Sequence, residues 1–214
     1  VTGPRARAEA GELLCGTIDS WLTWKLPGGA VTATDATNAS RTLLFDLEHQ
    51  AWSPHMLTLF KVPAALLPEV RDTAGDYGQT TADLLGAPVP IRALVGDQQS
   101  ALMGQGCIRA GQMKATYGTG CFMLLNTGEE RPVSRARLLT TVAARIAGKP
   151  SFALEGSIFI AGAAIKWLED AFRLQGGPQA VEALAREARA ENAVVLVPAF
   201  TGLGAPWCRA PHGR

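Results

Sequence analysis

The chain has 214 residues and a formal net charge of +1; 47% of its residues are hydrophobic and 18% are charged. This composition is typical of a globular protein with one large domain or two modest ones, and the balanced charge argues against a protein that binds nucleic acid through a basic surface. No apolar stretch approaches the roughly 20 residues that cross a bilayer, and no signal-peptide pattern begins the sequence. The widely spaced cysteines, Cys15, Cys107, Cys121 and Cys208, predict reduced thiols in a cytoplasmic protein, not disulfides or a metal site.

Helices and strands alternate in the first half of the predicted structure. In chain order we expect a helix at 16–26, a strand at 40–47, a helix at 53–61, a buried strand at 89–96 and a helix at 98–106. The helix at 53–61 has the strongest local signal, because Ser53 suits an N-cap and Pro54 suits the first helical position. An alternation of this kind predicts an α/β fold.

The second half begins with a β-rich region. Strands are expected in an antiparallel meander at 111–118, 121–128, 138–146 and 151–157, followed by helices at 158–174 and 177–190 and a buried strand at 193–200. Glycine-rich residues 104–111 are the best candidate for a domain boundary, which divides the chain into 1–105 and 106–214. Because the sequence does not begin with Met and ends in no recognisable element, we expect a piece of a longer protein.

The stretch "VGDQQSALMG" (95–104) places one acid and two amides where the predicted buried strand ends and a helix begins. Ligands bind at such positions in α/β sheets, so Asp97 could take a proton from a substrate hydroxyl. Gln98 offers both a donor and an acceptor to a neighbouring hydroxyl. The alternative is that Asp97 only caps the helix, and on the local pattern this alternative is favoured.

Two further motifs suggest a phosphate site. "TYGTGCF" (116–122) places Gly118, Thr119 and Gly120 at a hairpin tip, where exposed backbone N–H groups and a hydroxyl suit phosphate oxygens. The simpler interpretation of these glycines is a tight turn. Within "EGSIFIAGAAIKW" (155–167), the small residues near Gly162 leave room for a flat ligand or for a closely packed neighbouring helix.

The order and spacing of "GDQQSALMGQ", "TYGTGCFMLLNTGE", "ALEGSIFIAGAAIKWL" and "VPAFTGLGAPW" resemble the FGGY family of carbohydrate kinases, specifically its glycerol-phosphorylating members, over nearly the whole chain. The resemblance implies an actin/Hsp70-like α/β fold of two ribonuclease-H-like domains, with ATP and a polyol in the cleft between them. Residues 1–105 would then be the C-terminal part of the N-terminal, substrate-side domain. Residues 106–214 would be the N-terminal part of the C-terminal, nucleotide-side domain.

On the substrate side, the resemblance implies that Asp97 contacts the alcohol and acts as general base. It implies that Gln98 binds glycerol beside it and that Phe122 packs against the glycerol carbons. The implied reaction is ATP-dependent phosphorylation of glycerol to sn-glycerol 3-phosphate. The alternatives are a kinase for another polyol or sugar and a non-catalytic, degenerate actin-like nucleotide-binding fragment.

On the nucleotide side, the resemblance implies that Thr119, with Gly118 and Gly120, forms a phosphate-contacting hairpin and that Gly162 contacts the nucleotide. ATP and Mg²⁺ are the implied cofactors, and no residue is assigned as a metal ligand. The resemblance also implies a homodimer or homotetramer for the full-length protein. Since much of each ligand site would lie outside these 214 residues, we expect the chain by itself to be inactive.

Overall fold

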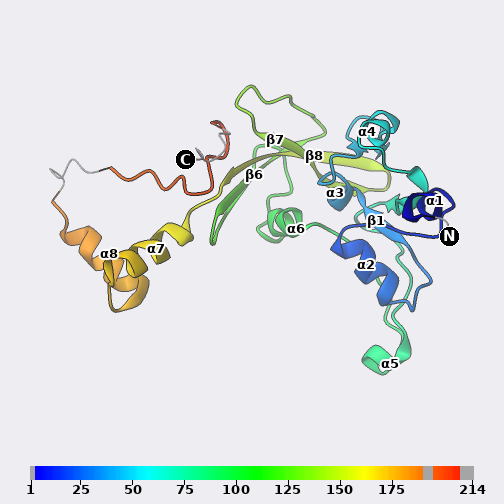
Figure 1. Cartoon of the computed structure of the whole chain (residues 1–214), viewed down its shortest axis with the longest axis horizontal. Helices are drawn as coiled ribbons and strands as arrows, with labels where there is room; N and C mark the ends of the chain where they lie inside the picture. Colours follow the sequence, from blue (N-terminus) through cyan, green and yellow to red (C-terminus); the bar gives the residue numbers. More distant parts are fainter. Residues whose placement is uncertain (1–2, 190–194, 208–214) are drawn as a thin grey trace.

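The computed structural model describes residues 3–189 and 195–207 (Figure 1). Its helices are α1 (Pro4–Glu9), α2 (Ile18–Lys25), α3 (Ala36–Ala39), α4 (Pro54–Leu59), α5 (Ala82–Leu85), α6 (Asp97–Gly104), α7 (Gly162–Phe172) and α8 (Gly177–Glu187), with a short 3₁₀ helix, η1, at Ala64–Leu66. Its strands are β1 (Ala33–Asp35), β2 (Phe45–Asp46), β3 (Ala51–Trp52), β4 (Glu69–Arg71), β5 (Met113–Tyr117), β6 (Cys121–Gly128), β7 (Leu139–Ile146) and β8 (Lys149–Ile158).

The four long strands form one antiparallel sheet with the order β5–β6–β8–β7. The expected antiparallel pairing is confirmed, but the expected meander is wrong, because β8 lies between β6 and β7. Residues 129–138 connect β6 to β7, and this connection is long enough for β7 to bypass one strand position. A tight turn at Ala147 and Gly148, both with positive φ, then returns the chain into the gap.

The buried core contains residues from both halves of the sequence. One cluster joins Ala36, Ala39 and Phe45 to Val142 and Phe152 of the long sheet. A second cluster, on α6, the segment after it and the sheet, consists of Leu102, Cys107, Leu124, Ala143 and Ala153. The first half therefore packs directly on β7 and β8, and the domain boundary at 104–111 stays a prediction.

The first half is less regular than its sequence pattern predicts. The helices at 16–26, 53–61 and 98–106 are confirmed as α2, α4 and α6, and Ser53 accepts a hydrogen bond from the backbone of Met56 as an N-cap. The strand at 40–47 is reduced to the two residues of β2. The predicted buried strand at 89–96 is wrong, because this segment is largely exposed and makes only two isolated bridges, to Ala74 and Gln79.

In the second half the helix predicted at 158–174 begins later, at Gly162, because β8 extends to Ile158. The predicted buried strand at 193–200 is wrong where it is described: residues 195–199 have no regular secondary structure, Phe200 makes one isolated bridge, and Val195 is 85% exposed. Residues 193 and 194 of that segment, and Cys208, lie outside the described residues.

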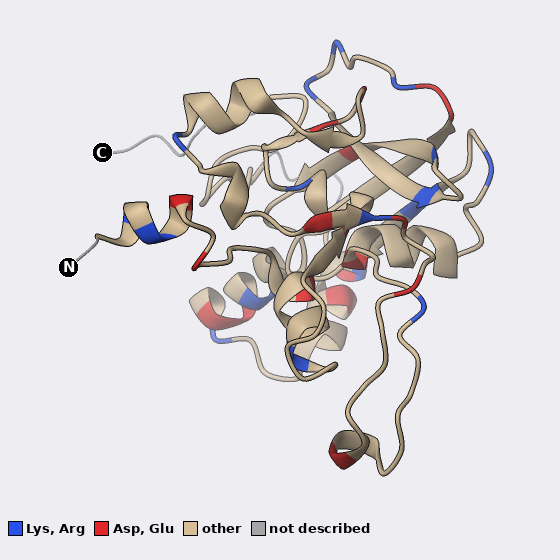
Figure 2. Cartoon of the chain, turned by 90° about the vertical axis from the view of Figure 1, so that its right-hand side faces the viewer, with Lys and Arg blue, Asp and Glu red and all other residues tan. Residues whose placement is uncertain are grey.

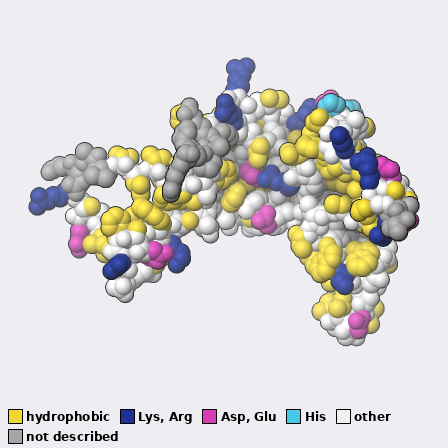
Figure 3. Space-filling model, in the orientation of Figure 1, with side chains coloured by type: hydrophobic (Ala, Val, Ile, Leu, Met, Phe, Trp, Pro, Cys, Tyr) yellow, Lys and Arg dark blue, Asp and Glu magenta, His cyan; other side chains and the backbone are white. Residues whose placement is uncertain are grey.

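Lys and Arg residues are interspersed with Asp and Glu over the fold (Figure 2). Apolar side chains remain exposed over α2, including Ile18, Trp21 and Trp24, and they form part of the yellow area at the lower right of Figure 3. Helices α7 and α8 pack on each other at one end of the molecule, away from the main body (Figure 1). In the part of the chain that is described, no helix has the length and apolarity needed to cross a membrane.

Candidate functional site

The start of α6 is held in place by a buried hydrogen-bond relay from the first half of the chain. Asp35 caps α3 and accepts a hydrogen bond from the hydroxyl of Thr37 at 2.8 Å. The same Thr37 hydroxyl accepts a hydrogen bond from the backbone N–H of Gly96, also at 2.8 Å. Since Gly96 is the N-cap of α6, the relay fixes the position of the residue that follows it, Asp97.

Asp97 occupies the first helical position and its side chain is exposed. The favoured interpretation of Asp97 as the N-cap residue is therefore wrong, because the N-cap is Gly96, which has no side chain. One carboxylate oxygen of Asp97 accepts only from the backbone N–H of the next residue, Gln98, at 2.7 Å. The carboxylate thus lies at the positive end of a helix and remains accessible to a ligand.

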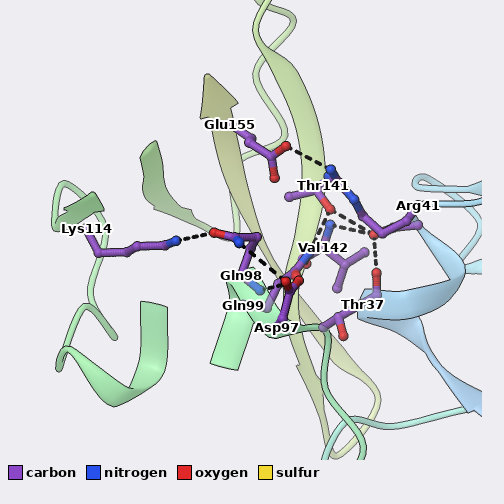
Figure 4. Close-up of polar contacts among 10 residues, drawn as sticks. Thr37, Arg41, Asp97, Gln98, Gln99, Lys114, Thr141, Val142 and Glu155 are labelled. Atoms are coloured by element: carbon purple, nitrogen blue, oxygen red, sulfur yellow. Dashed lines mark hydrogen bonds and ion pairs between the residues drawn. The ribbon is translucent and has the colours of Figure 1, made fainter. Parts of the chain in front are cut away.

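The two glutamines that follow Asp97 reach opposite edges of the long sheet (Figure 4). Oε1 of Gln98 accepts a hydrogen bond from Nζ of Lys114 on edge strand β5, at 2.5 Å. Gln99 is 1% exposed, and its amide donates to Oγ1 of Thr141 at 3.1 Å and to the carbonyl of Val142 at 3.3 Å, both on edge strand β7. Together they fasten the start of α6 across the face of the sheet.

Phe122 lies on the sheet face that α6 covers. It pairs directly with Thr116 of β5, and the Thr116 hydroxyl accepts a hydrogen bond from the same Lys114 ammonium at 2.8 Å. Directly paired residues on antiparallel strands project from one face of the sheet. The structure therefore places Phe122 on the side of the hairpin from which Lys114 reaches Gln98.

An ion pair across the core lies on the same face. Glu155 is 2% exposed and pairs with Arg41, with 2.8 Å between the carboxylate oxygen and the guanidinium nitrogen (Figure 4). Among the described residues, the second carboxylate oxygen of Glu155 has no hydrogen-bond partner. Burial lowers the pKa of Lys114, whereas the negative charges of Glu155 and Asp97 oppose this shift. Two buried charged side chains, Lys114 and Glu155, thus lie on the sheet face that α6 covers.

The second group of predicted residues comes together at the tip of the β5–β6 hairpin. The backbone N–H of Gly162, at the start of α7, donates to the carbonyl of Gly118 at 2.9 Å, and Ala161 and Ala163 donate to the carbonyl of Thr119. A Cβ atom added to Gly162 would lie 2.6 Å from the carbonyl oxygen of Gly118, and one added to Gly120 would lie 2.7 Å from that of Ile158. The glycines are therefore required for close packing of the tip on α7 and β8.

Sequence reasoning missed the residues that connect these groups, chiefly Lys114, Thr37 and Thr141. One of them did carry a signal: Lys114 is the only charged residue between Arg109 and Glu129. A single charge within a long apolar hairpin is unusual, because a charged side chain is rarely buried unless it is paired. The two threonines carried no such signal, since their partners lie far away in the sequence.

Comparison with known proteins places this arrangement in a family. Residues 3–104 match the model of the N-terminal domain of the FGGY family of carbohydrate kinases, and residues 113–212 match that of its C-terminal domain. The chain is 59% identical to the glycerol kinase of Alcanivorax borkumensis over all 214 of its residues and 56% identical to that of Cereibacter sphaeroides. It spans 43% of the length of each of these relatives.

Solved structures agree with the sequence matches. The crystal structure of Plasmodium falciparum glycerol kinase with ADP superposes with a TM-score of 0.86 and 36% identity, covering 96% of this chain and 41% of that one. A ligand-bound xylulose kinase from Lactobacillus acidophilus shares the fold, with a TM-score of 0.75 and 19% identity, covering 87% of this chain and 38% of its own. The expected α/β sugar-kinase fold is confirmed over the part of its length that these residues represent, and the chain belongs to the FGGY family of carbohydrate kinases.

Proposed function

We propose that this chain provides the acceptor side of an ATP-dependent glycerol kinase, which converts glycerol to sn-glycerol 3-phosphate. The observation that carries the proposal is the exposed carboxylate of Asp97 at the first position of a helix whose next two residues are fastened to the sheet. The high identity to curated glycerol kinases supports glycerol as the acceptor. Because these relatives are more than twice as long, the activity is proposed for a full-length chain.

In this proposal Asp97 accepts the proton of the attacking hydroxyl. The exposed carboxylate at the helix start is accessible to an alcohol, and a positioned base typically contributes about 10²–10⁴-fold to the rate. Gln98 binds a hydroxyl of the same substrate, and Phe122 contacts its carbon chain. The register of β5 and β6, which places Phe122 on the face that α6 covers, supports this division of roles.

The hairpin tip is proposed to contact the nucleotide through Gly118, Thr119 and Gly120, and Gly162 through the start of α7. Gly118 follows Lys114 by four residues, which corresponds to about 13 Å along an extended strand. The tip therefore lies about 13 Å beyond the strand position whose side chain reaches Gln98, a separation that a nucleoside triphosphate could span. The solved relative with ADP supports a nucleotide ligand for this family member.

Mg²⁺ is proposed to be carried with ATP. Within residues 3–189 and 195–207, no group of three or more His, Cys, Asp or Glu side chains could hold a metal. At phosphoryl-transfer sites Mg²⁺ is generally bound by substrate phosphates and water with one or two carboxylates. When bound, Mg²⁺ would neutralise charge on the transferring phosphoryl group.

The location and assembly of the protein are also proposals. The free thiols of Cys15, Cys107 and Cys121 support a reducing compartment such as the cytoplasm. Assembly into homodimers or homotetramers is proposed from the family resemblance alone. The size of the full-length protein in solution, measured by light scattering, tests it.

The base assignment is tested in a chimera in which residues 1–214 replace the matching part of the Alcanivorax borkumensis glycerol kinase. We expect Asp97→Asn to lower kcat for glycerol about 10²–10⁴-fold while leaving ATP affinity within about twofold. Asp83→Asn, on the short helix α5, is the matched control and should retain full activity. Near-normal turnover by Asp97→Asn would overturn the assignment, and a panel of polyols and sugars assayed with the unmodified chimera decides the acceptor.

A further inference from the structure

We propose that Lys114 is a positioning residue that fixes the side-chain amide of Gln98 as a hydrogen-bond donor toward the acceptor alcohol. The proposal rests on the proposed kinase function and specifies how its acceptor site distinguishes hydroxyl groups. Without Lys114, either the oxygen or the NH₂ end of the Gln98 amide could face the substrate. With Lys114 in place, only the NH₂ end can do so.

The geometry around Lys114 determines that polarity. Lys114 is 4% exposed, and its ammonium donates to Oε1 of Gln98 at 2.5 Å and to the hydroxyl of Thr116 at 2.8 Å. An ammonium group has three donors and no acceptor, so only the oxygen end of the Gln98 amide is able to face it. The NH₂ end must then point the other way, and it lies 3.4 Å from Oδ2 of Asp97.

The charge of the buried ammonium is supported by the sheet itself. Lys114 pairs with Leu124 and Leu124 pairs with Glu155, so the lysine and the glutamate project from one face, two strands apart. Burial lowers the pKa of Lys114, but the neighbouring carboxylates of Glu155 and Asp97 favour the charged form. Glu155 retains one buried oxygen without a hydrogen-bond partner among the described residues. The ammonium is therefore balanced by negative charge within the fold.

This arrangement gives the acceptor site two groups of opposite polarity on consecutive residues. The Asp97 carboxylate accepts hydrogen bonds only, and the outward end of the Gln98 amide donates only. A hydroxyl group satisfies both, because it donates one hydrogen bond and accepts others. A protonated amine in the same place could donate to Asp97 but could not accept from Gln98, so the outward N–H of Gln98 would be left without a partner. Sites built in this way reject the mismatched analogue strongly.

The test compares glycerol with its two amino analogues, 2-amino-1,3-propanediol and 3-amino-1,2-propanediol, in the chimera described above. Each analogue is measured as a substrate and as a competitive inhibitor of glycerol phosphorylation. Lys114→Met removes the ammonium and frees the amide of Gln98 to rotate. We expect the preference for glycerol over at least one analogue to fall at least tenfold, with kcat for glycerol changed much less than KM.

Lys149→Met, at the exposed start of β8, is the matched control and should leave this preference unchanged. Lys114→Arg keeps a donor-only group and should retain most of the preference. An unchanged preference in Lys114→Met, with glycerol still phosphorylated, would overturn the role of Lys114 and leave the proposed kinase function intact. Absence of glycerol phosphorylation by the unmodified chimera would instead reject the proposed function.

A second variant keeps the test decisive if Lys114→Met does not fold. Gln98→Glu retains an oxygen for Lys114 but removes both N–H donors. We expect kcat/KM for glycerol to fall at least tenfold, with an unchanged melting temperature. If Gln98 instead served as an acceptor, Gln98→Glu would preserve kcat/KM, and the proposal would be refuted.

Discussion

Thr37 connects the first half of the chain to the start of α6, and its removal provides a quantitative test of the relay. The side chain is fully buried, and its hydroxyl lies 2.8 Å from both Oδ1 of Asp35 and the backbone nitrogen of Gly96. Valine has nearly the same shape, so Thr37→Val removes the hydroxyl without opening a cavity. The N–H of Gly96 then loses its buried partner, while Asp35 still accepts from Thr73 and from the backbone of Asn38.

An unsatisfied buried donor costs about 1–3 kcal/mol, and a lost hydrogen bond to a charged group about 1.5–3 kcal/mol. Because Asp35 keeps other donors, we expect a total near 2–4 kcal/mol. At about 1.36 kcal/mol per factor of ten, this corresponds to a roughly 30- to 900-fold larger equilibrium constant for local opening at the start of α6. Hydrogen–deuterium exchange of the α6 amides in the chimera measures this local opening, with the amides of α4 as an internal reference.

Thr58→Val is the matched control, since Thr58 is exposed and its hydroxyl contacts only a carbonyl within its own helix. It should change α6 exchange less than about twofold, a difference within the usual effect of surface substitutions. An equally small change in Thr37→Val would refute the reasoning, because the relay would then contribute nothing to the position of Asp97. A uniform increase over α4 and α6 would indicate general destabilisation and would also contradict the local argument.

Two further predictions concern a surface pair and the hairpin tip. The hydrogen bond at 2.9 Å between His49 and Asp46 raises the pKa of His49 and lowers that of Asp46 to about 2. The pair therefore stabilises the folded state most between about pH 4 and 6.5 and less on either side. Asp46→Asn should lower the pKa of His49 measured by NMR, and an unchanged pKa contradicts this prediction. Gly162→Ala should weaken ADP binding to the chimera at least tenfold, about 1.4 kcal/mol, by calorimetry, because its Cβ would meet the Gly118 carbonyl at 2.6 Å. Gly104→Ala, which meets nothing within 4 Å, is the control, and equal affinities would refute the steric argument.

Elements with strong local signals were predictable from the sequence. Ser53 and Pro54 begin α4 as expected, because capping and proline geometry depend on adjacent residues only. The hairpin tip at Gly118–Gly120 was also expected from its glycines, although neither has a positive φ and Gly120 is instead required by its close packing on Ile158. The strand order was not predictable in the same way. Whether β7 or β8 pairs with β6 depends on contacts between distant residues, which no local pattern encodes.

The error at 89–96 has a specific physical origin. Its apolar residues suggested a buried strand. Apolar runs of this length also occur in extended segments that pair with one neighbouring segment only. Ile91 and Leu94 do make extended-chain hydrogen bonds, to Gly78 and Thr73, yet they have no regular second partner in the described structure. The sequence pattern thus identified an extended conformation and overestimated its burial.

Identifying the candidate site required both the sequence motifs and the contacts between elements of the structure. The local pattern marked Asp97 and Gln98 as a possible ligand site but favoured a helix cap for Asp97, whereas the N-cap in the structure is Gly96. The family resemblance supplied the roles of these two residues and added Phe122. Lys114 was not assigned, because its importance depends on a contact with Gln98 that is made only when the hairpin packs against α6. Contacts between elements therefore decide the chemistry of residues whose positions the motifs already mark.

The helical order of Asp97, Gln98 and Gln99 explains why the acid comes first. Successive side chains on an α-helix are separated by about 100°, so the first and third residues point roughly 160° apart. Gln99 is buried against β7, and Asp97 consequently faces away from the sheet toward solvent, with Gln98 between them at the edge that meets β5. An exchange of Asp97 and Gln99 would bury a carboxylate beside Thr141 and the carbonyl of Val142, an acceptor that no ionised acid can bind. The order of these three residues therefore separates the reactive group from the two that hold the helix.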